Sequence, residues 1–162
     1  MQSGAWGRIG AVGLRIRRGG VADASAAADL WLRARKAALG VIPAPVHSDD
    51  EVRWWFTEHV VPALELWVAE SEELEVLGLL VLDGDWIDQL YVDPDWTGRG
   101  IGGHLVEIAK RERPHSLRLW TFVSNGRAQR FYERHGFVAV DCTNGSENEE
   151  RAPDIQYAWS GS

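Results

Sequence analysis

The sequence predicts a single α/β domain in which a mixed β-sheet is flanked by four helices. Two patterns support this class: short apolar runs of strand-like character, and longer segments with apolar residues at helical spacing between them. In addition, no internal repeat or linker interrupts the 162 residues, and a chain of this length is most simply one domain. The predicted order of elements is β-α-α-β-β-β-α-β-α-β-β.

The N-terminal part of this order is one strand followed by two helices. Residues 14–17 alternate apolar and basic side chains, as a strand does, and we interpret the basic side chains as a solvated face. Residues 21–39 place alanine, tryptophan and leucine at helical spacing, and Gly40 ends this helix. Ser48 is a good N-cap for a second helix, because three acidic residues follow it, and this helix continues to about Pro62.

An antiparallel meander follows, because short polar turns separate three strand-like runs. These runs cover residues 66–70, 76–82 and 86–92. The remaining elements are a helix over 100–113, a strand over 117–123, a helix over 125–135, and strands over 137–143 and 155–159. Pro114 blocks extension of the first of these helices, and Gly136 ends the other as a left-handed cap.

The charge of the chain limits the classes of partner. Its formal net charge is −7, with 24 acidic against 17 basic residues. Because nucleic-acid binding relies on a basic surface, this balance argues against such a partner and favours cationic small molecules or peptides. No apolar run reaches the ~20 residues that a membrane helix needs, so we expect no membrane partner.

The single cysteine limits the chemistry further. Cys142 alone excludes an internal disulfide framework and a thiolate metal site, and we expect no metal. This cysteine usage fits a reducing cytoplasm. Residues 1–12 lack the continuous apolar core of a signal peptide, so we expect a flexible tail there and a folded domain over 13–162.

The most informative segment is a glycine-rich turn over residues 98–103, between the predicted strand 86–92 and a predicted helix. Alternating glycines let a backbone approach a ligand closely, and the first turn of a helix adds unpaired N–H groups and positive potential. The turn is not a Walker loop, because no Gly-Lys-Ser or Gly-Lys-Thr follows it. It is also too late in the chain for a dinucleotide fingerprint, so it predicts a phosphate site of another kind.

A second motif points to the ligand. The segment from Asn125 to Phe137 resembles the second signature of the GNAT superfamily of acyl-CoA-dependent N-acyltransferases, and the segment from Leu90 to Gly103 resembles its first signature. The order of elements in the rest of the chain also looks like this fold. The resemblance implies a bacterial-type N-acetyltransferase with acetyl-CoA as cosubstrate.

Carried onto this sequence, the resemblance implies which residues bind acetyl-CoA. Backbone groups of Leu90, Tyr91 and Val92 would pair with the pantetheine arm as an added strand, and Asn125 would hold that arm from the start of the last helix. Ala128, on the same helix face, would leave room for it. The main chain of one loop would wrap the pyrophosphate: Thr97, Gly98, Arg99, Gly100, Ile101, Gly102 and Gly103. Thr97 departs from the glutamine or arginine that is usual in the superfamily, and Arg99 is the residue that could compensate.

Tyr132 is the candidate general acid. The resemblance puts it near the thioester sulfur, and its spacing from Asn125 and Ala128 places all three on one helix face. A phenol there could protonate the departing thiolate. The alternative is a half-buried packing residue.

The general base is harder to assign. Many members of the superfamily carry a glutamate where this chain has Trp86 or Trp120, so the usual base is missing. Asp88 lies on the same strand face as Trp86 and is the first candidate, acting through water; its alternative is a surface charge or an ion pair with an arginine. Three further candidates are weaker: His47, His59 and Glu70.

We therefore expect transfer of an acetyl group to a primary amine of a small molecule by direct attack in a ternary complex, without an acyl-enzyme on Cys142. The alternatives are acetylation of a protein N-terminus or lysine, and a non-catalytic acyl-CoA sensor. A homodimer is compatible with the tryptophan content. The acidic loop over 147–150 is either a solvated turn or a border of the acceptor entrance. Five tryptophans divide between core and acceptor pocket in a way that spacing leaves open: Trp31, Trp54, Trp55, Trp86 and Trp120.

Overall fold

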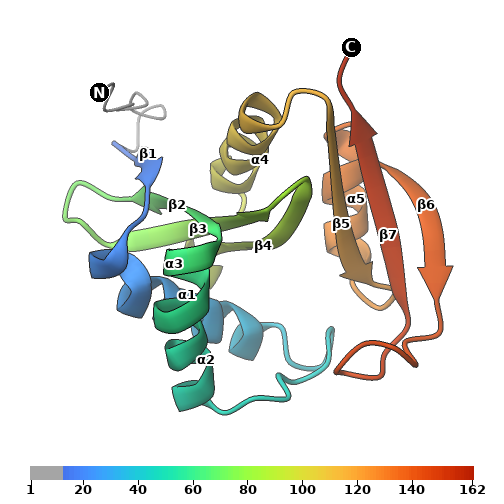
Figure 1. Cartoon of the computed structure of the whole chain (residues 1–162), viewed down its shortest axis with the longest axis horizontal. Coiled ribbons are helices and arrows are strands. Elements are labelled where there is room, and N and C mark those ends of the chain that lie inside the picture. Colours follow the sequence, from blue (N-terminus) through green and yellow to red (C-terminus); the bar gives the residue numbers. More distant parts are fainter. Residues whose placement is uncertain (1–12) are drawn as a thin grey trace.

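The computed structural model describes residues 13–162 as one seven-stranded mixed sheet with helices on both faces, as predicted (Figure 1). The expected tail over residues 1–12 lies outside the described residues. Along the sheet the order is β1-β2-β3-β4-β5-β7-β6. The strands are β1 Arg15–Arg18, β2 Glu65–Glu70, β3 Val76–Asp83, β4 Trp86–Val92, β5 Ser116–Phe122, β6 Val138–Thr143 and β7 Asp154–Ser160.

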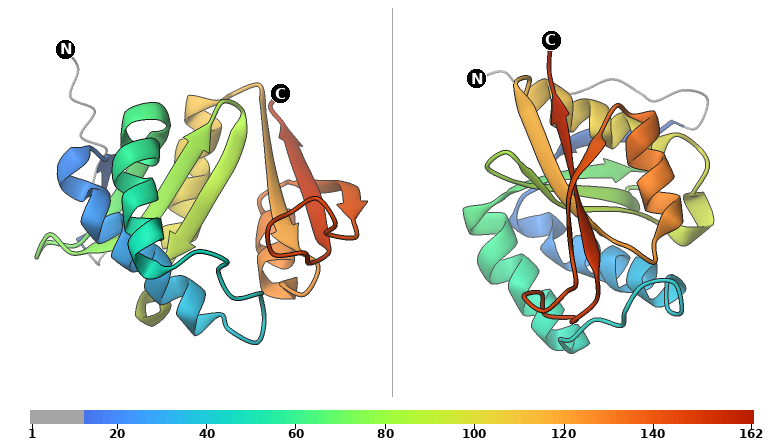
Figure 2. Two further views of the ribbon diagram at one scale, coloured as in Figure 1. Left: turned by 60° about the horizontal axis from the view of Figure 1, so that its bottom comes forward. Right: turned by 90° about the vertical axis from the view of Figure 1, so that its right-hand side faces the viewer.

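The helices form two layers. The longer ones are α1 Ala24–Ala37, α2 Asp49–Trp55, α4 Ile101–Glu112 and α5 Gly126–Arg134. Buried residues of α1 and α2 pack with one face of the sheet, whereas those of α4 and α5 pack with the other face (Figure 2). Each face therefore has its own apolar core, and no helix in residues 13–162 is long and apolar enough to cross a bilayer.

The second predicted helix is interrupted. After α2 the chain makes a π-helical turn, η3, over Phe56–Val60, and then the short α3, Val61–Ala63. The N–H of Val61 donates to the carbonyl of Phe56, five residues earlier. The next residue, Pro62, has no N–H to continue an α-helical ladder, which accounts for the change of helix type here.

The sheet opens between β4 and β5. These parallel strands pair only at Trp86 and Arg118, and beyond that point β5 turns away from β4 (Figures 1 and 2). On its other edge β4 pairs with β3 along its length, antiparallel as predicted. One edge of β4 is thus without a strand partner over most of its length, within the part of the chain that the structure describes.

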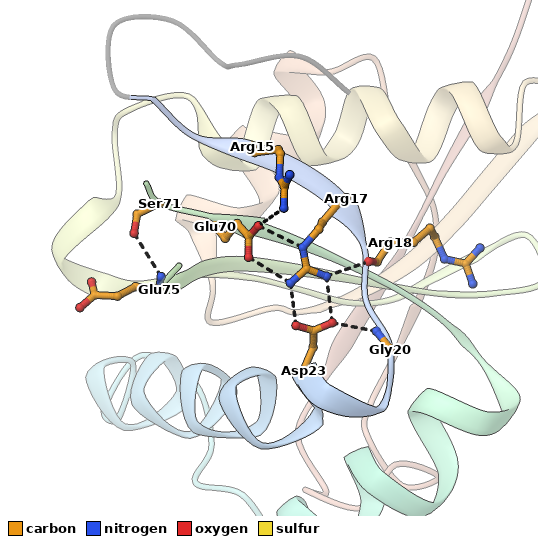
Figure 3. A network of polar contacts seen from close by, with 8 residues as sticks. All are labelled: Arg15, Arg17, Arg18, Gly20, Asp23, Glu70, Ser71 and Glu75. Atoms are coloured by element: carbon orange, nitrogen blue, oxygen red, sulfur yellow. Dashed lines mark hydrogen bonds and ion pairs between the residues drawn. The ribbon is translucent and has the colours of Figure 1, made fainter. Parts of the chain in front are cut away.

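The basic strand β1 is only partly the solvated face that its sequence suggests (Figure 3). Arg17 donates to both oxygens of Asp23 at 2.9 and 2.8 Å, and to both oxygens of Glu70 at 3.1 and 3.0 Å. Arg15 adds a third donor to Glu70 at 2.6 Å. The reason is that Glu70 of β2 lies opposite Arg15 in the register and brings a buried carboxylate to this end of the sheet.

This network also decides against one candidate base. Glu70 is only 3% exposed, and two guanidinium groups occupy its carboxylate. The hydrogen bonds from Arg17, and then those from Arg15, lower the pKa of this carboxyl. Glu70 also lies two strands from β4 in the sheet, so it joins β1 to β2 instead of serving the opening between β4 and β5.

Candidate active site

The open edge of β4 carries the three residues expected to bind the cofactor arm. Leu90, Tyr91 and Val92 pair with β3 on one side. Leu90 and Val92 pack toward the α4 layer and Tyr91 toward the α1 layer, which fixes the strand between both cores. The other edge is available to an extended ligand, because an extended chain can add to a free strand edge through main-chain hydrogen bonds.

The glycine-rich turn follows directly and has the backbone that its sequence predicts. Gly98 and Gly100 have φ of 77° and 86°, a region that disfavours side chains. Nothing lies within 4 Å of a side-chain carbon built at Gly98. Gly100 caps α4, whose first N–H groups receive no side-chain cap. The turn therefore offers open space beside free amides at the positive end of a helix, which suits a phosphate.

Gly102 and Gly103 have a second role that the motif did not reveal. A side-chain carbon at Gly102 would lie 3.2 Å from the Phe131 ring, and one at Gly103 would lie 3.2 Å from His135. These two glycines therefore let α4 approach α5 closely. Ile101, 1% exposed, anchors the start of α4 on β3.

The long and polar side chains of the turn are occupied locally. The Arg99 guanidinium lies 4.5 Å from the centre of the Trp96 ring. Thr97 donates its hydroxyl to the carbonyl of Pro94 at 3.4 Å. Neither residue is buried, so the Arg99 charge is free to turn toward an anion at the cost of a solvent-exposed stacking contact.

The helix α5 begins as predicted. The Asn125 side-chain oxygen accepts a hydrogen bond from the N–H of Ala128 at 3.1 Å, so Asn125 is the N-cap. Ala128 packs at the edge of the α4-side core. Tyr132, one turn further on, is 8% exposed and stands edge-on to Phe131 and Phe137, with ring centres 5.1 and 5.5 Å away.

Tyr132 is thus a buried packing residue, and its packing has a chemical consequence. Burial raises the pKa of its phenol, and the nearby Tyr91 adds to the shift. The phenol keeps its proton at neutral pH, which a general acid requires. Its role in protonating a thiolate remains a prediction.

Asp88 occupies an irregular position in β4. Val81 of β3 pairs with Gln89 and Leu82 pairs with Ile87, so Asp88 is the extra residue of a β-bulge. Its carboxylate accepts a hydrogen bond from the Gln89 side chain at 3.3 Å. Desolvation raises the pKa of Asp88, whereas the Gln89 hydrogen bond lowers it. Within residues 13–162 no arginine forms an ion pair with Asp88.

Two hollows have residues of β4 in their linings, Asp88 in the first and Gln89 in the second. The first, of about 420 Å³, is lined by Asp88, Trp120, Thr121, Phe122, Thr143, Glu147, Asn148, Glu150 and Asp154. The second, of about 490 Å³, is lined by Trp31, Arg35, Pro45, Val46, His47, Glu51, Val52, Trp54, Trp55, Gln89, Glu149 and Glu150. Both volumes suit a small ligand.

The tryptophans divide between core and hollow. Trp31 is 8% exposed, as helical spacing predicts, and still reaches the second hollow, where its indole N–H donates to Gln89 at 2.8 Å. Trp54 is 65% exposed at the rim of that hollow. Trp86 and Trp120 stack with ring planes 8° apart and centres 6.2 Å apart, across the point where β4 and β5 diverge.

The acidic loop between β6 and β7 closes the far side of both hollows. Glu147 and Glu150 line the first hollow and Glu149 and Glu150 the second, so this loop borders the hollows instead of being only a solvated turn. His47 joins the loop to the opposite wall, with Nδ1 2.8 Å from Glu51 and Nε2 3.1 Å from Glu149. These carboxylates, Glu51 first, raise the pKa of His47.

The other histidine candidate belongs to the π-helical turn. His59 stacks on Trp55, with ring centres 6.2 Å apart, and its electrostatic effect reaches Asp88. Sequence reasoning missed Arg35, Gln89 and Thr121, which only the fold brings to the hollows. Among residues 13–162, no group of three or more histidine, cysteine or acidic side chains is arranged to hold a metal ion.

With this geometry established, comparison with known proteins becomes informative. The family model described as "Acetyltransferase (GNAT) domain" matches residues 62–139, which include the open β4 edge, the glycine-rich turn and α5. This match covers just under half of the chain, and together with the named relatives it supports an acetyl-CoA-dependent acyltransferase of the GNAT type. The mixed sheet has the fold of solved GNAT acetyltransferases.

Proteins similar to this chain include bacterial N-acetyltransferases. It is 39% identical over 77 residues to the peptidyl-lysine N-acetyltransferase YjaB of Salmonella typhimurium, which covers 48% of this chain and 52% of that protein. The match to YjaB of Escherichia coli is 28% over 150 residues, or 91% of this chain and 98% of the relative. The first match thus spans about half of its relative, and the second nearly all of it.

Solved structures give the same fold. The apo solution structure of Escherichia coli YjaB has a TM-score of 0.73 at 26% identity and covers 92% of this chain and 99% of that one. The PaiA N-acetyltransferase of Thermoplasma acidophilum, solved in complex with coenzyme A, has a TM-score of 0.68 at 18% identity and covers 91% and 98%. At that identity the second likeness concerns the fold alone.

Proposed function

We propose that this protein transfers the acetyl group of acetyl-CoA to a primary amine of a small cationic molecule, by direct attack in a ternary complex. The observation that carries the proposal is the placement of Asp88. This bulged carboxylate of β4 lies two residues from the free strand edge and lines an acidic, tryptophan-walled hollow. Cosubstrate and acceptor would thus meet at one strand.

The chemistry assigned to each residue follows from the needs of the reaction. An ammonium acceptor has a pKa of about 10.4 and must lose a proton before it can attack. Asp88 would take this proton through a water. The amine nitrogen then bonds to the thioester carbonyl carbon, and main-chain N–H groups around Leu90 to Val92 would stabilise the oxyanion.

The collapse of that intermediate needs a proton donor. The C–S bond breaks with its electron pair on sulfur, and Tyr132 would donate its phenolic proton to this sulfur. Tyr132 recovers a proton from the positively charged nitrogen of the intermediate. The net products are the acetylated amine, the free thiol of CoA and one proton, taken up first by Asp88 and then released to solvent.

The size and charge of the hollows support a small cationic acceptor. Each hollow is in the volume range of small-molecule sites. Carboxylates outnumber basic side chains in their linings, and tryptophan faces stand beside them, a combination that attracts ammonium groups. His47 contacts Glu51 and Glu149 across the second hollow, which restricts entry to that hollow.

A lysine side chain of a protein is the second candidate acceptor. Two relatives are named peptidyl-lysine N-acetyltransferases, one of them matched over nearly its whole length. The exposed Trp54 at the rim of the second hollow could contact a peptide. Release of CoA with free amines and with lysine peptides separates the two candidates. Binding of acetyl-CoA without turnover on either class would instead favour an acyl-CoA sensor.

The Tyr132→Phe variant tests the chemistry itself. We expect kcat to fall about a hundredfold, because general acid catalysis contributes about 10²–10⁴. The KM for acetyl-CoA should stay within about twofold, since the ring that packs the core is retained. Tyr157→Phe is the matched control: it removes a phenol of β7 that donates to Glu133 of α5. Unchanged turnover in Tyr132→Phe would remove the general-acid assignment.

A further inference from the structure

Glu150 is the residue at which the two hollows meet, because it lines both of them. Its side chain is 18% exposed. Within residues 13–162 no group donates a hydrogen bond to its carboxylate; Arg35 forms a long ion pair with it at 3.8 Å, beyond hydrogen-bond distance. A largely buried carboxylate is costly unless donors satisfy it, so Glu150 is a site for an incoming donor.

Arg35 attracts the Glu150 carboxylate but does not donate a hydrogen bond to it. Arg35 is 5% exposed, donates to the carbonyl of Pro43 at 2.9 Å, and lies 5.0 Å from the centre of the Trp31 ring. Its Nε has no partner in the described part of the chain. The arginine is therefore held by α1 and the following loop, and its charge attracts the carboxylate from a fixed place.

The loop that carries Glu150 is also held in place. Asn148 donates to the carbonyl of Ala152 at 2.7 Å and to Asp154 at 3.1 Å, and Asp154 also accepts a hydrogen bond from Thr143. These bonds brace the loop on both sides of Glu150. They also occupy the Asp154 carboxylate, which leaves Asp88, Glu147 and Glu150 as the acids of the first hollow that can serve a ligand.

The charge of the first hollow exceeds what one ammonium group needs. Its lining includes four carboxylates and no basic side chain. The reacting amine must become neutral before it attacks, so a carboxylate that holds an ammonium stably cannot serve that nitrogen. Asp88 lies next to the strand edge and can serve the reacting amine. Glu150 is therefore available to a different group of the ligand.

We propose that Glu150 binds a second, permanently charged ammonium or guanidinium group of the acceptor, and so selects acceptors with two positive charges. This inference rests on the proposed acetyl transfer. The acceptor class is a diamine, or a lysine with a basic group beside it. Glu150 is a specificity residue: it contacts the acceptor away from the reacting nitrogen.

The test compares amines of equal length with one or two charges. Release of CoA is measured with 1,5-diaminopentane against 1-aminopentane, and with lysine peptides that carry arginine or glutamine next to the lysine. The wild type should prefer the doubly charged member of a pair about tenfold in kcat/KM. Glu150→Gln should abolish the preference through KM for the doubly charged amine, with the singly charged amine and acetyl-CoA unchanged within about twofold.

Two further variants make the result specific. Glu150→Asp, which retains the charge, should restore part of the preference. Glu73→Gln, in the exposed β2–β3 loop, removes the same charge far from the hollows and should leave all constants unchanged. An equal loss toward both amines, or a lowered thermal midpoint with the preference intact, would make Glu150 a structural residue and overturn the inference. If the wild type releases no CoA with any amine or peptide, the proposed function itself fails.

Discussion

Two acidic regions of this molecule differ in how their carboxylates are satisfied. At the end of β1 and β2, Glu70 and Asp23 accept hydrogen bonds from Arg15 and Arg17 through several oxygen–nitrogen contacts (Figure 3). Beside the opening of the sheet, Asp88 accepts one weak hydrogen bond and Glu150 accepts none from residues 13–162. Groups of the chain satisfy the carboxylates of the first region, whereas the described residues donate few or no hydrogen bonds to those of the second.

The pKa values of Glu70 and Asp88 shift in opposite directions, according to whether arginines donate hydrogen bonds to the carboxylate. Hydrogen bonds from Arg17 lower the pKa values of Asp23 and Glu70. Desolvation raises the pKa of Asp88, because no cation compensates it to the same extent. A carboxylate that accepts hydrogen bonds from arginines stabilises the fold, whereas a desolvated carboxylate without such donors is available for proton transfer. Burial alone therefore does not distinguish a structural acid from a functional one.

The largest expected effect is on stability, in the first region. Glu70→Gln removes a buried charge that two arginines share, and breaking such a pair costs about 3 kcal/mol. We expect this loss in the free energy of unfolding, measured by urea denaturation, with kcat/KM for the remaining folded enzyme unchanged. A fall in kcat/KM without loss of stability would show that the network serves the reaction.

The same variant should change how stability depends on pH. The folded-state pKa of Glu70 is lowered, so its contribution is fully present above the unfolded pKa, about 4.3, and is lost as the pH falls toward the folded pKa. The wild type should therefore lose stability on acidification below about pH 4–5, and Glu70→Gln should lose less over that window.

A smaller effect is expected on catalysis, in the second region. Asp88→Asn removes the candidate base, and we expect kcat to fall about thirtyfold, or about 2 kcal/mol in activation free energy. Thermal stability should be unchanged or slightly higher, because the desolvated charge is gone. Steady-state release of CoA and a thermal melt test both statements. A wild-type kcat would exclude Asp88 as the base.

The smallest effect concerns the His47 bridge at the rim. Glu51 and Glu149 raise the pKa of His47, so the charged bridge is present below the ordinary histidine pKa of about 6.5 and is lost as the pH rises through the raised value. We expect the KM for the amine to differ about twofold between wild type and His47→Gln at pH 6, and to converge at pH 9, because exposed ion pairs are weak. A constant ratio of the two KM values across this range would show that the bridge does not limit access.

The sequence predicted the local backbone features of the proposed site better than its hollows, for a physical reason. The β4 edge, the Gly98–Gly100 turn and the Asn125 cap are local features, set by residues close together in the chain. The bulge at Asp88 was not foreseen, because a bulge depends on the register with β3. Similarly, the packing role of Gly102 requires Phe131 from another helix.

Two of the errors have the same long-range origin, and the third has a local one. The arginines of β1 read as a solvated face because their partner Glu70 lies 53 to 55 residues further along the chain. The sequence leaves Glu70 as a weak candidate base, but its register opposite Arg15 makes it the acceptor of hydrogen bonds from the arginines of β1. The second helix was expected to be continuous, although the proline that ends its α-helical ladder is visible in the sequence.

By itself, the sequence determined the α/β class, the order of the elements, the GNAT motifs and the turn that suits a phosphate, because backbone geometry and periodicity are encoded in neighbouring residues. Only the tertiary structure decided which carboxylates are satisfied. Glu70 and Glu150 are both glutamates with other acidic residues nearby in the sequence. They differ in whether the fold brings a guanidinium within hydrogen-bond distance. That distance depends on strand register and loop packing, which link residues far apart in the chain.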